Sequence, residues 1–408
     1  MINLYPYLND PDVDSVVMFP NGFKAGKLYT VFPRFGFFTA ERDLTAYRTV
    51  QSTTIPDLKF LQFMGANVPL CDYEYSTCPE LFIQKESFNY FLNTADFNAV
   101  NWNTSGTITE DYGQGPDLLP FSAARFQDAN VYQTTDFGGP YLTLSVYAKR
   151  NTASTIRLYQ DTADITYTLS DNWERYTFTT IPSGPCDIGF EIVGDALIWI
   201  PQFEEGDFAT SPIPNGATEN IRPKDIIYKE ITGREEYLMY FDVRLRSGAN
   251  IDDYFEVIGS LNDGTNDYYC AIGVSNTNEF IVNLYNNPDN QYQVFEAYPD
   301  GIHRVAVKWS SDSVKVWIDG TNVYEANNEA GVNPLGITRY DLGTIAGSLN
   351  PIKDRIRGSI FMGGAVGTLP TDAEIVQLTT ISDAAEYMIS QGGDFILSES
   401  GEYMILEQ

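Results

Sequence analysis

The sequence predicts an all-β protein made of tandem antiparallel β-sandwiches, and three observations support this prediction. The 408 residues include 27 tyrosines and 25 phenylalanines, which favour strands over helices. Several segments alternate apolar and polar side chains with a period of two, as half-buried strands do. Turn signals separate these segments at short intervals. A chain of this length has room for two to four domains with cores of their own.

Three segments in the first half of the chain carry strand signals. Residues 142–149 place Leu142, Leu144, Val146 and Ala148 on one face, and residues 173–180 alternate in the same way after a turn. Residues 196–203 also alternate and lead into a run with two prolines, which favour extended backbone. We therefore predict an antiparallel sandwich at residues 86–210, followed by a proline-containing linker at residues 211–234.

The second half of the chain predicts another sandwich, at residues 235–380. Thr371 and Glu374 have the spacing of a capping box, which predicts a short helix near the end of this region. Before it, the alternating pattern predicts strands at residues 238–245, 254–258, 268–274, 280–285, 303–309, 313–319 and 355–361.

The net charge of −30 argues against nucleic acid as a partner, because a strongly acidic surface repels phosphates. No apolar run approaches the roughly 18 residues of a membrane-spanning helix, so we expect no membrane insertion. The N-terminal residues lack the basic and apolar parts of a signal peptide. We expect the acidity to keep a sheet-rich protein soluble through self-repulsion.

Several segments resemble phage tail-fibre and tailspike proteins. The residues QFEEG at 202–206, TSPIP at 210–214 and the pair Arg222 and Asp225 are similar to the exit of the β-sandwich module in those proteins. Residues 38–50 and 66–97 resemble two blocks that precede the module. The resemblance implies a jelly roll, like a carbohydrate-binding module, for residues 86–210. It also implies a virion protein that folds in the host bacterial cytoplasm and is then carried on the outside of the particle.

Two segments of the second half resemble concanavalin-like and laminin-G-like domains. Residues 303–320 are similar to a strand pair of that fold, and LPTDAEIVQLT at 369–379 is close to its closing helix. The resemblance implies a concanavalin-like sandwich for residues 235–380.

Residues 1–85 are expected to form an irregular strand-and-loop attachment region, because prolines interrupt it early. Short strands are expected at residues 27–37 and 44–50. The first thirty residues do not match the phage proteins, so we expect them to contact other virion proteins.

The four cysteines are too scattered for a disulfide framework. Cys71 and Cys78 could pair locally, but a virion protein folds in a reducing cytosol, and we expect free thiols. No CxxC motif is present and the chain has a single histidine, so a zinc site is not expected.

An eight-residue repeat ends the chain, with the units YMISQGGD, FILSESGE and YMILEQ starting at residues 387, 395 and 403. Three short strands cannot bury their own faces, so residues 381–408 are predicted to join subunits. By resemblance to fibres the assembly is a homotrimer. The expected interface side chains are Tyr387, Ile389, Phe395, Leu397, Tyr403 and Ile405.

No catalytic motif supports an enzyme. The only histidine, His303, lies in a predicted strand with no G-x-S-x-G motif in the chain. The residues DGTND at 263–267 lack the ligand spacing of an EF-hand and are interpreted as a turn. With 55 acidic residues, a carboxylate pair at glycosidase distance arises by chance. We therefore expect no catalytic residues, no cofactor and no metal.

Aromatic side chains are the remaining functional candidates, because sugars stack on exposed rings. The candidates for glycan contact are Trp102, Tyr268, Tyr269 and Trp317, of which Trp317 alternates away from Val314, Val316 and Ile318. The predicted function is non-catalytic adhesion of a virion fibre, such as a tail fibre, to host-surface or environmental glycans. The alternatives are a head-fibre, capsid-decoration or tail scaffold protein without a ligand, and a glycan-degrading tailspike, which the missing motifs disfavour.

Overall fold

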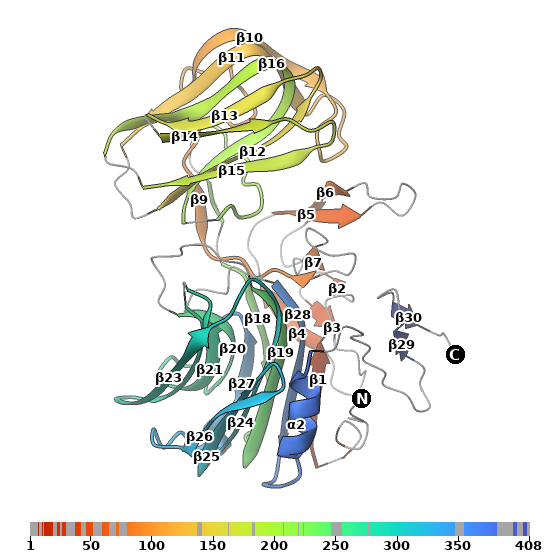
Figure 1. The fold of residues 1–408 in the computed structure, drawn as a ribbon, viewed down its shortest axis with the longest axis vertical. Helices are drawn as coiled ribbons and strands as arrows, with labels where there is room; N and C mark the ends of the chain where they lie inside the picture. The colour runs from red at the N-terminus through yellow and green to blue at the C-terminus, as the bar shows by residue number, and fades with distance from the viewer. Residues whose placement is uncertain are drawn as a thin grey trace.

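The computed structural model describes residues 80–381, apart from gaps at 137–140, 162, 182–183, 207, 219, 223, 246–254, 276 and 347–354. Outside this range it describes residues 7, 10, 12–18, 23–24, 27–29, 37–41, 46–51, 59–64, 71–72, 395–397 and 403–405. The described elements are almost all strands in antiparallel sheets, which confirms the predicted fold class. Two sandwiches lie one above the other (Figure 1).

The first sandwich is formed by seven strands that follow one another in the sequence. Strands β10, β11, β16, β12 and β15 are hydrogen-bonded in that order, while β13 pairs with both β14 and β16. The bounds are β10 Asn103–Gly113, β11 Ala123–Thr135, β12 Leu142–Arg150, β13 Thr155–Gln160, β14 Ala163–Thr168, β15 Glu174–Thr180 and β16 Cys186–Glu205.

The core of the first sandwich contains the face of β12 that the sequence predicts, with Leu142, Leu144, Val146 and Ala148 all buried. The alternation predicted for residues 196–203 is interrupted at Ile200, which has a positive φ of 35°. The register of β16 against β12 shifts in the same region. A β-bulge of this kind lets one long strand change direction within the sandwich.

The second sandwich consists of two large sheets. The eight-stranded sheet has the order β26, β25, β24, β19, β28, β8 and β7, and β1 also pairs with β28. Its bounds are β1 Asp14–Met18, β7 Cys71–Asp72, β8 Glu80–Leu81, β19 Glu236–Leu245, β24 Gly301–Ser310, β25 Ser313–Ile318, β26 Thr321–Asn327 and β28 Arg355–Gly364.

The nine-stranded sheet faces it and has the order β2, β3, β4, β18, β27, β20, β21, β22 and β23. Its bounds are β2 Phe23–Lys24, β3 Lys27–Tyr29, β4 Phe37–Glu41, β18 Ile226–Glu230, β20 Glu256–Asn262, β21 Tyr268–Val274, β22 Glu279–Asn286, β23 Asp289–Ala297 and β27 Arg339–Leu342. The turn between β22 and β23 contains a cis peptide bond at Asn287–Pro288. The largest apolar cluster of the described residues lies between the two sheets and includes Phe241, Trp309 and Tyr340.

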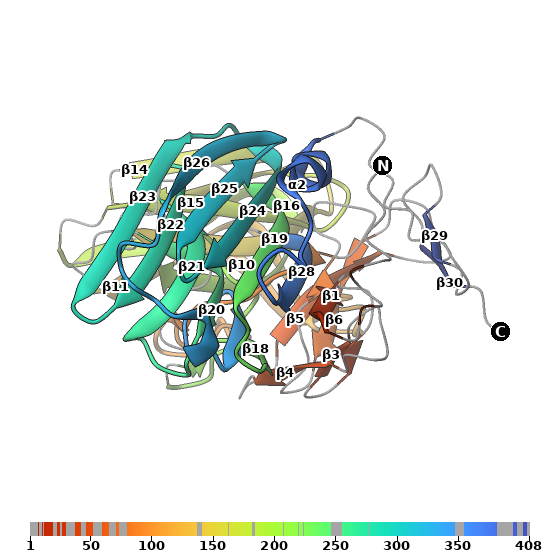
Figure 2. The ribbon, with the colours of Figure 1, turned by 90° about the horizontal axis from the view of Figure 1, so that it is seen from below.

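The predicted closing helix is present as α2 (Asp372–Thr379), which lies beside the eight-stranded sheet (Figure 2). Thr371 accepts a hydrogen bond from the Glu374 backbone N–H, and the Glu374 side chain accepts one from the Thr371 N–H, as the capping box predicts. Ile375 and Leu378 pack on the outer face of the sheet together with Trp317. The helix therefore covers a sheet face that would otherwise be apolar and exposed.

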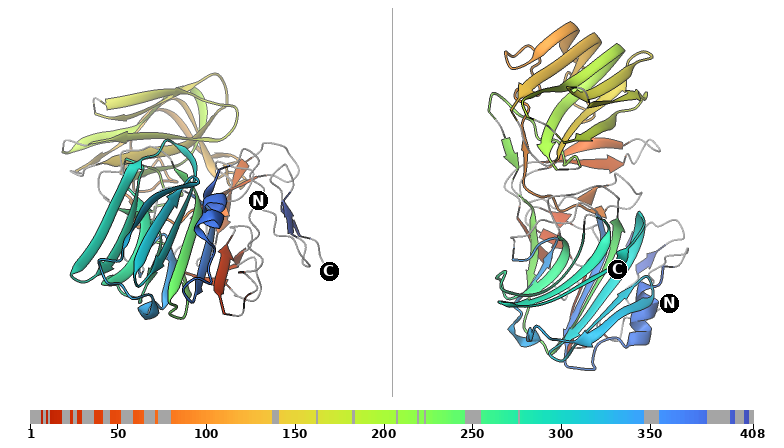
Figure 3. Two further views of the ribbon diagram at one scale, coloured as in Figure 1. Left: turned by 60° about the horizontal axis from the view of Figure 1, so that its bottom comes forward. Right: turned by 60° about the vertical axis from the view of Figure 1, so that its left-hand side comes forward.

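Strands of the N-terminal 85 residues belong to both sheets of the second sandwich. β1 and β8 each pair with β28, and β4 pairs with β18. The Glu80 carboxylate, 2% exposed, accepts hydrogen bonds of 3.0 Å and 2.7 Å from Arg244 Nε and Nη2. Figure 1 shows β1, β3 and β4 at the side of the lower sandwich, and the left view of Figure 3 shows a red N-terminal strand beside the blue C-terminal ones. The first 85 residues, expected as an attachment region, thus contribute strands and core side chains to a domain 150 or more residues further along the chain.

The segment between the sandwiches is hydrogen-bonded and buried. The Asp225 N–H donates to the Gln84 carbonyl at 2.8 Å, and the Gln84 N–H donates to the Asp225 carboxylate at 3.1 Å. Arg222 is 1% exposed and donates to the Ser211 carbonyl at 2.9 Å. β17 (Asn220–Arg222) also pairs with β9 (Ser87–Asn89). The Arg222 and Asp225 pair therefore anchors the stretch that was expected as a linker.

Glu204, at the end of β16, is a second anchor of this stretch. Its buried carboxylate accepts hydrogen bonds from the Ser87 hydroxyl at 2.5 Å and from the Thr210 N–H at 2.8 Å. A buried carboxylate is costly unless donors surround it. Ser87 and Thr210 supply those donors to Glu204.

The C-terminal repeat forms a hairpin of β29 (Phe395–Leu397) and β30 (Tyr403–Ile405). Phe395 pairs with Ile405, and Leu397 pairs with Tyr403. The first repeat unit, with Tyr387 and Ile389, lies outside the described residues.

Candidate functional site

Two of the four predicted sugar-binding aromatics are core residues. Trp317 is 0% exposed and lies under α2, so the alternation that turns it away from Val316 directs it into a second core. Trp102 is 6% exposed, and its indole N–H donates to the Asn93 carbonyl at 3.0 Å. Neither ring has a face open to a sugar.

The two predicted tyrosines lie on opposite faces of β21. Tyr268 packs against the main core of the second sandwich, and its hydroxyl donates to the Asn333 carbonyl at 2.8 Å. Tyr269 lies on the outer face of the nine-stranded sheet, in a cluster with Tyr285. Tyr269 is itself 7% exposed.

Strand register builds that outer face row by row. One row runs across the sheet from Tyr228 through Asp341, Ser260 and Ala271 to Asn283 and then Tyr292. The next row runs from Arg339 through Asn262 and Tyr269 to Tyr285 and then Asn290. Side chains in neighbouring positions of such rows are close enough to act on one ligand.

At the end of the rows formed by β27 and β20, a hydrogen-bond network around Asp341 links the side chains of the two rows. Asp341 accepts hydrogen bonds from Asn262 Nδ2 at 2.7 Å, from Arg339 Nε at 2.6 Å and from the Ala346 N–H at 2.9 Å. Burial raises the pKa of Asp341, although the Arg339 charge opposes this shift. The network fixes the segment that follows β27 over the sheet. This chain reversal uses Gly343 at φ 72°, where an added Cβ would lie 2.7 Å from the Ile83 side chain.

At the β22 and β23 end, three tyrosines surround one amide, and Tyr269 and Asn283 are 7% and 8% exposed. We name Tyr269, Asn283, Tyr285 and Tyr292 the tyrosine face. The Tyr269 and Tyr285 rings are 5.4 Å apart with a tilt of 31°, and Tyr292 is 39% exposed. The Asn283 amide donates to the Tyr269 hydroxyl at 3.2 Å, while its buried Oδ1 has no hydrogen-bond partner among the described residues.

The sequence of β22 contains a pattern that predicts this face. In β22, the residues Phe280, Val282 and Leu284 point into the core, so Asn283 and Tyr285 share the opposite face. An asparagine within the apolar middle of this strand indicates that the outer face makes polar contacts. Tyr292 could not be assigned to the face, because no strand was predicted at β23.

His303 is held by structural contacts. Its Nδ1 is 2.7 Å from the Asp319 carboxylate and its Nε2 is 2.8 Å from the Pro299 carbonyl oxygen. Burial lowers its pKa, but these two hydrogen bonds and the Asp319 charge outweigh burial and raise it overall. Both ring nitrogens are therefore engaged, and the expectation that the chain is not an enzyme stays a prediction.

The oxygen-rich segment at 263–267 forms the turn that was expected. Asp263 accepts hydrogen bonds from the Thr265 N–H at 2.9 Å and from the Thr265 hydroxyl at 2.5 Å. Within the described ranges, no three His, Cys, Asp or Glu side chains gather as a metal site would require. Cys186 and Cys270 are buried thiols without a disulfide, whereas Cys78 lies outside the described residues. The helices in the described part of the chain are too short or too polar to cross a membrane.

Comparisons with known proteins give no family. No family model and no curated protein sequence matches the chain. Among solved structures, it is similar to the CBM40 of the Ruminococcus gnavus IT-sialidase bound to α2,3-sialyllactose, with 17% identity over 36% of this chain and 84% of that one and a TM-score of 0.31.

Two other similar structures are a domain of an enzyme and a domain of a toxin. One is domain 4 of the arabinanase AbnA from Geobacillus stearothermophilus in complex with arabinotriose, at 14% identity over 38% of this chain and 73% of that one, with a TM-score of 0.30. The other is the binding domain of botulinum neurotoxin serotype G, at 13% identity over 38% and 40% of the two chains, with a TM-score of 0.29. Likeness at this level assigns neither a family nor a ligand.

Proposed function

We propose that this chain binds glycans without catalysis, through the tyrosine face of the second sandwich. The observation that carries the proposal is the Asn283 amide with its buried, unpartnered Oδ1 among three tyrosines. Sugars present C–H faces to aromatic rings and hydroxyls to amides, so this combination fits an uncharged sugar. The resemblance of the sequence to phage fibres supports the finer proposal of a virion adhesion protein that contacts host-surface glycans.

Replacing Tyr292 by alanine is expected to weaken glycan binding about tenfold, which corresponds to ~1.4 kcal/mol of lost ring contact. Tyr285→Ala should act in the same direction. The measurement is binding of the full chain to a neutral glycan array, followed by titration calorimetry on the strongest hit. Tyr112→Ala is the matched control, because Tyr112 is 42% exposed and lies on the first sandwich.

Two outcomes would contradict the glycan proposal. Absence of binding to any arrayed glycan and to intact host cells would favour the structural alternative, in which the sandwiches act as spacers. Equal loss of affinity in Tyr112→Ala and Tyr292→Ala would remove the tyrosine face as the site. Release of reducing sugar from a host polysaccharide would instead indicate a glycan-degrading enzyme.

We also propose that the C-terminal repeat joins three copies of the chain. The β29 and β30 hairpin supports this proposal, since two strands are too few for an independent sheet. Light scattering is expected to give about three times the chain mass for residues 1–408 and the chain mass after deletion of residues 382–408. A monomeric full chain would refute the trimer. Three copies would place weak sites together and raise avidity.

A further inference from the structure

The outer face of the first sandwich gathers aromatic and basic side chains on two neighbouring strands. Tyr147 of β12 lies between Trp199 of β16 and Arg175 of β15 in the strand register. Ala148 pairs with Glu174, so Lys149 and Trp173 follow on the same side of these strands. We name Tyr147, Lys149, Trp173 and Arg175 the aromatic–cationic patch. All four side chains are half-buried.

The two cations of the patch differ from their neighbours because no carboxylate pairs with them among the described residues. Nearby, Arg150 is 2.6 Å from Asp171, and Arg125 is 2.5 Å from Asp195. Arg175 instead donates to the Ser145 hydroxyl at 2.9 Å and to the Thr210 carbonyl, while its buried Nε has no partner. Asp171 lies near enough to Lys149 for the two charges to interact, but Asp171 forms its ion pair with Arg150. In a chain with 55 acidic and 25 basic residues, two cations on one face without an ion pair among the described residues are unexpected.

The aromatic rings hold these cations in position. Lys149 Nζ lies 5.9 Å from the centre of the Trp173 ring, and the Arg175 guanidinium lies 5.3 Å from the centre of the Tyr147 ring. The Tyr147 ring in turn packs edge-on against Trp199 at 5.7 Å. Cation–π contacts of this kind leave the charge of each cation available to an anion.

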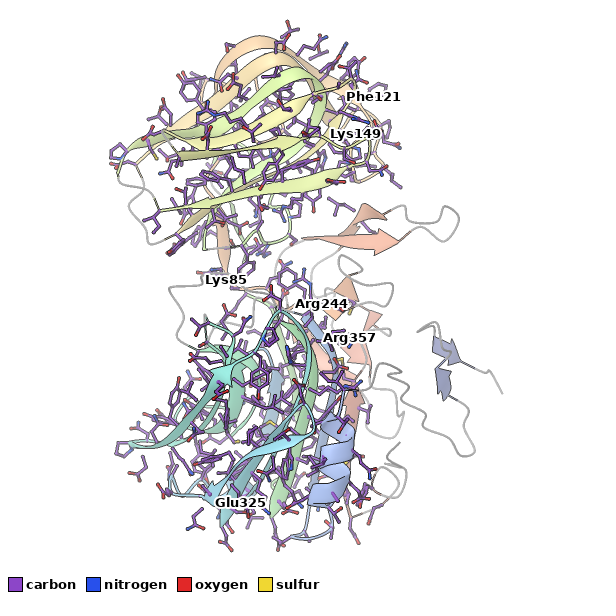
Figure 4. All side chains as sticks on the ribbon, in the orientation of Figure 1. Lys85, Phe121, Lys149, Arg244, Glu325 and Arg357 are labelled. Carbon is purple, nitrogen blue, oxygen red and sulfur yellow. The ribbon has the colours of Figure 1, made fainter. Side chains whose placement is uncertain are left out.

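An apolar loop borders the patch at one end. Leu119 and Phe121, in the loop between β10 and β11, are 58% and 65% exposed. Leu118 and Phe121 both have a positive φ, near 60°, which is costly for such side chains. The loop is fixed by hydrogen bonds such as Ser122 Oγ to Asp117 at 2.7 Å. Figure 4 shows Phe121 and Lys149 at the same end of the first sandwich.

We propose that the aromatic–cationic patch is a second binding site, for a saccharide that carries a carboxylate, such as a uronic acid. The ring face of the sugar would stack on Trp173, and its carboxylate would pair with Lys149 and Arg175. A net charge of −30 repels a polyanion at long range, so the ligand is a short acidic saccharide rather than a nucleic acid. This site goes beyond the proposed function, because it lies on the other sandwich and takes a charged ligand.

The test is titration of the full chain with trigalacturonate and with its uncharged methyl ester. We expect the acid to bind at least tenfold more tightly than the ester, with affinity falling as salt rises. Lys149→Met and Trp173→Ala should each weaken binding of the acid about tenfold. Arg157→Met is the matched control, because Arg157 is on β13 and is paired with Asp164. Melting curves establish that each variant is folded.

Equal affinity for the acid and the ester would overturn the inference, as would unchanged acid binding in folded Lys149→Met. So would no binding of the acid at millimolar concentration. Tyr292→Ala separates the two proposals, since it should weaken neutral glycan binding and leave trigalacturonate binding unchanged. If the tyrosine face fails its own test, this result for Lys149 still stands.

Discussion

Removal of residues 1–85 is expected to unfold the second sandwich and to leave the first sandwich folded. The deletion takes β1 and β8 from β28, and β4 from β18. Among the described residues, it also removes Val16, Met18, Cys71, Leu81 and Ile83 from the main core of the second sandwich, and Val13 and Val17 from the core under α2. Losing a large buried side chain costs about 2–5 kcal/mol, and a domain is stable by only about 5–15 kcal/mol.

Electrostatics add to this expected loss. Glu80 is the buried partner of Arg244 and also lies 3.6 Å from Arg357. Removing one side of a buried ion pair leaves the other charge uncompensated, which is strongly destabilising. Figure 4 shows Arg244 and Arg357 close to the boundary between the sandwiches.

The measurement is thermal unfolding of residues 86–408, with limited proteolysis to show which sandwich is cleaved. Deletion of residues 382–408 is the control, because the β29 and β30 hairpin is a sheet of its own. That variant should keep both sandwiches protected. If residues 86–408 protect the second sandwich as well as the full chain does, the N-terminal region is a dispensable arm.

Replacing Trp317 by alanine is expected to destabilise the second sandwich by about 3–5 kcal/mol, because the change opens a cavity under α2. Glycan binding by the folded fraction should stay unchanged. Denaturant unfolding followed by calorimetry on folded protein measures both quantities. Trp317→Phe should cost much less, because the buried indole N–H has no hydrogen-bond partner in the described part of the chain.

The result for Trp317 decides between core and binding residue. A folded Trp317→Ala protein of normal stability that has lost glycan binding would show that the ring contacts sugar.

The sequence alone determined features whose cause is local. The capping box at Thr371 and the face of β12 are fixed by residues a few positions apart, and both are present as predicted. The all-β class follows for the same reason, since alternation and turn residues act within one strand and its neighbour.

Only the tertiary structure decided which faces are covered. Alternation placed Trp317 opposite Val316 but could not reveal that α2 lies over it, because that cover comes from residues more than 50 positions later. In the same way, no local pattern shows that β1 pairs with β28, some 340 residues away. Tyr269 and Tyr292 come together because three adjacent strands align, and register between strands is set by the whole core.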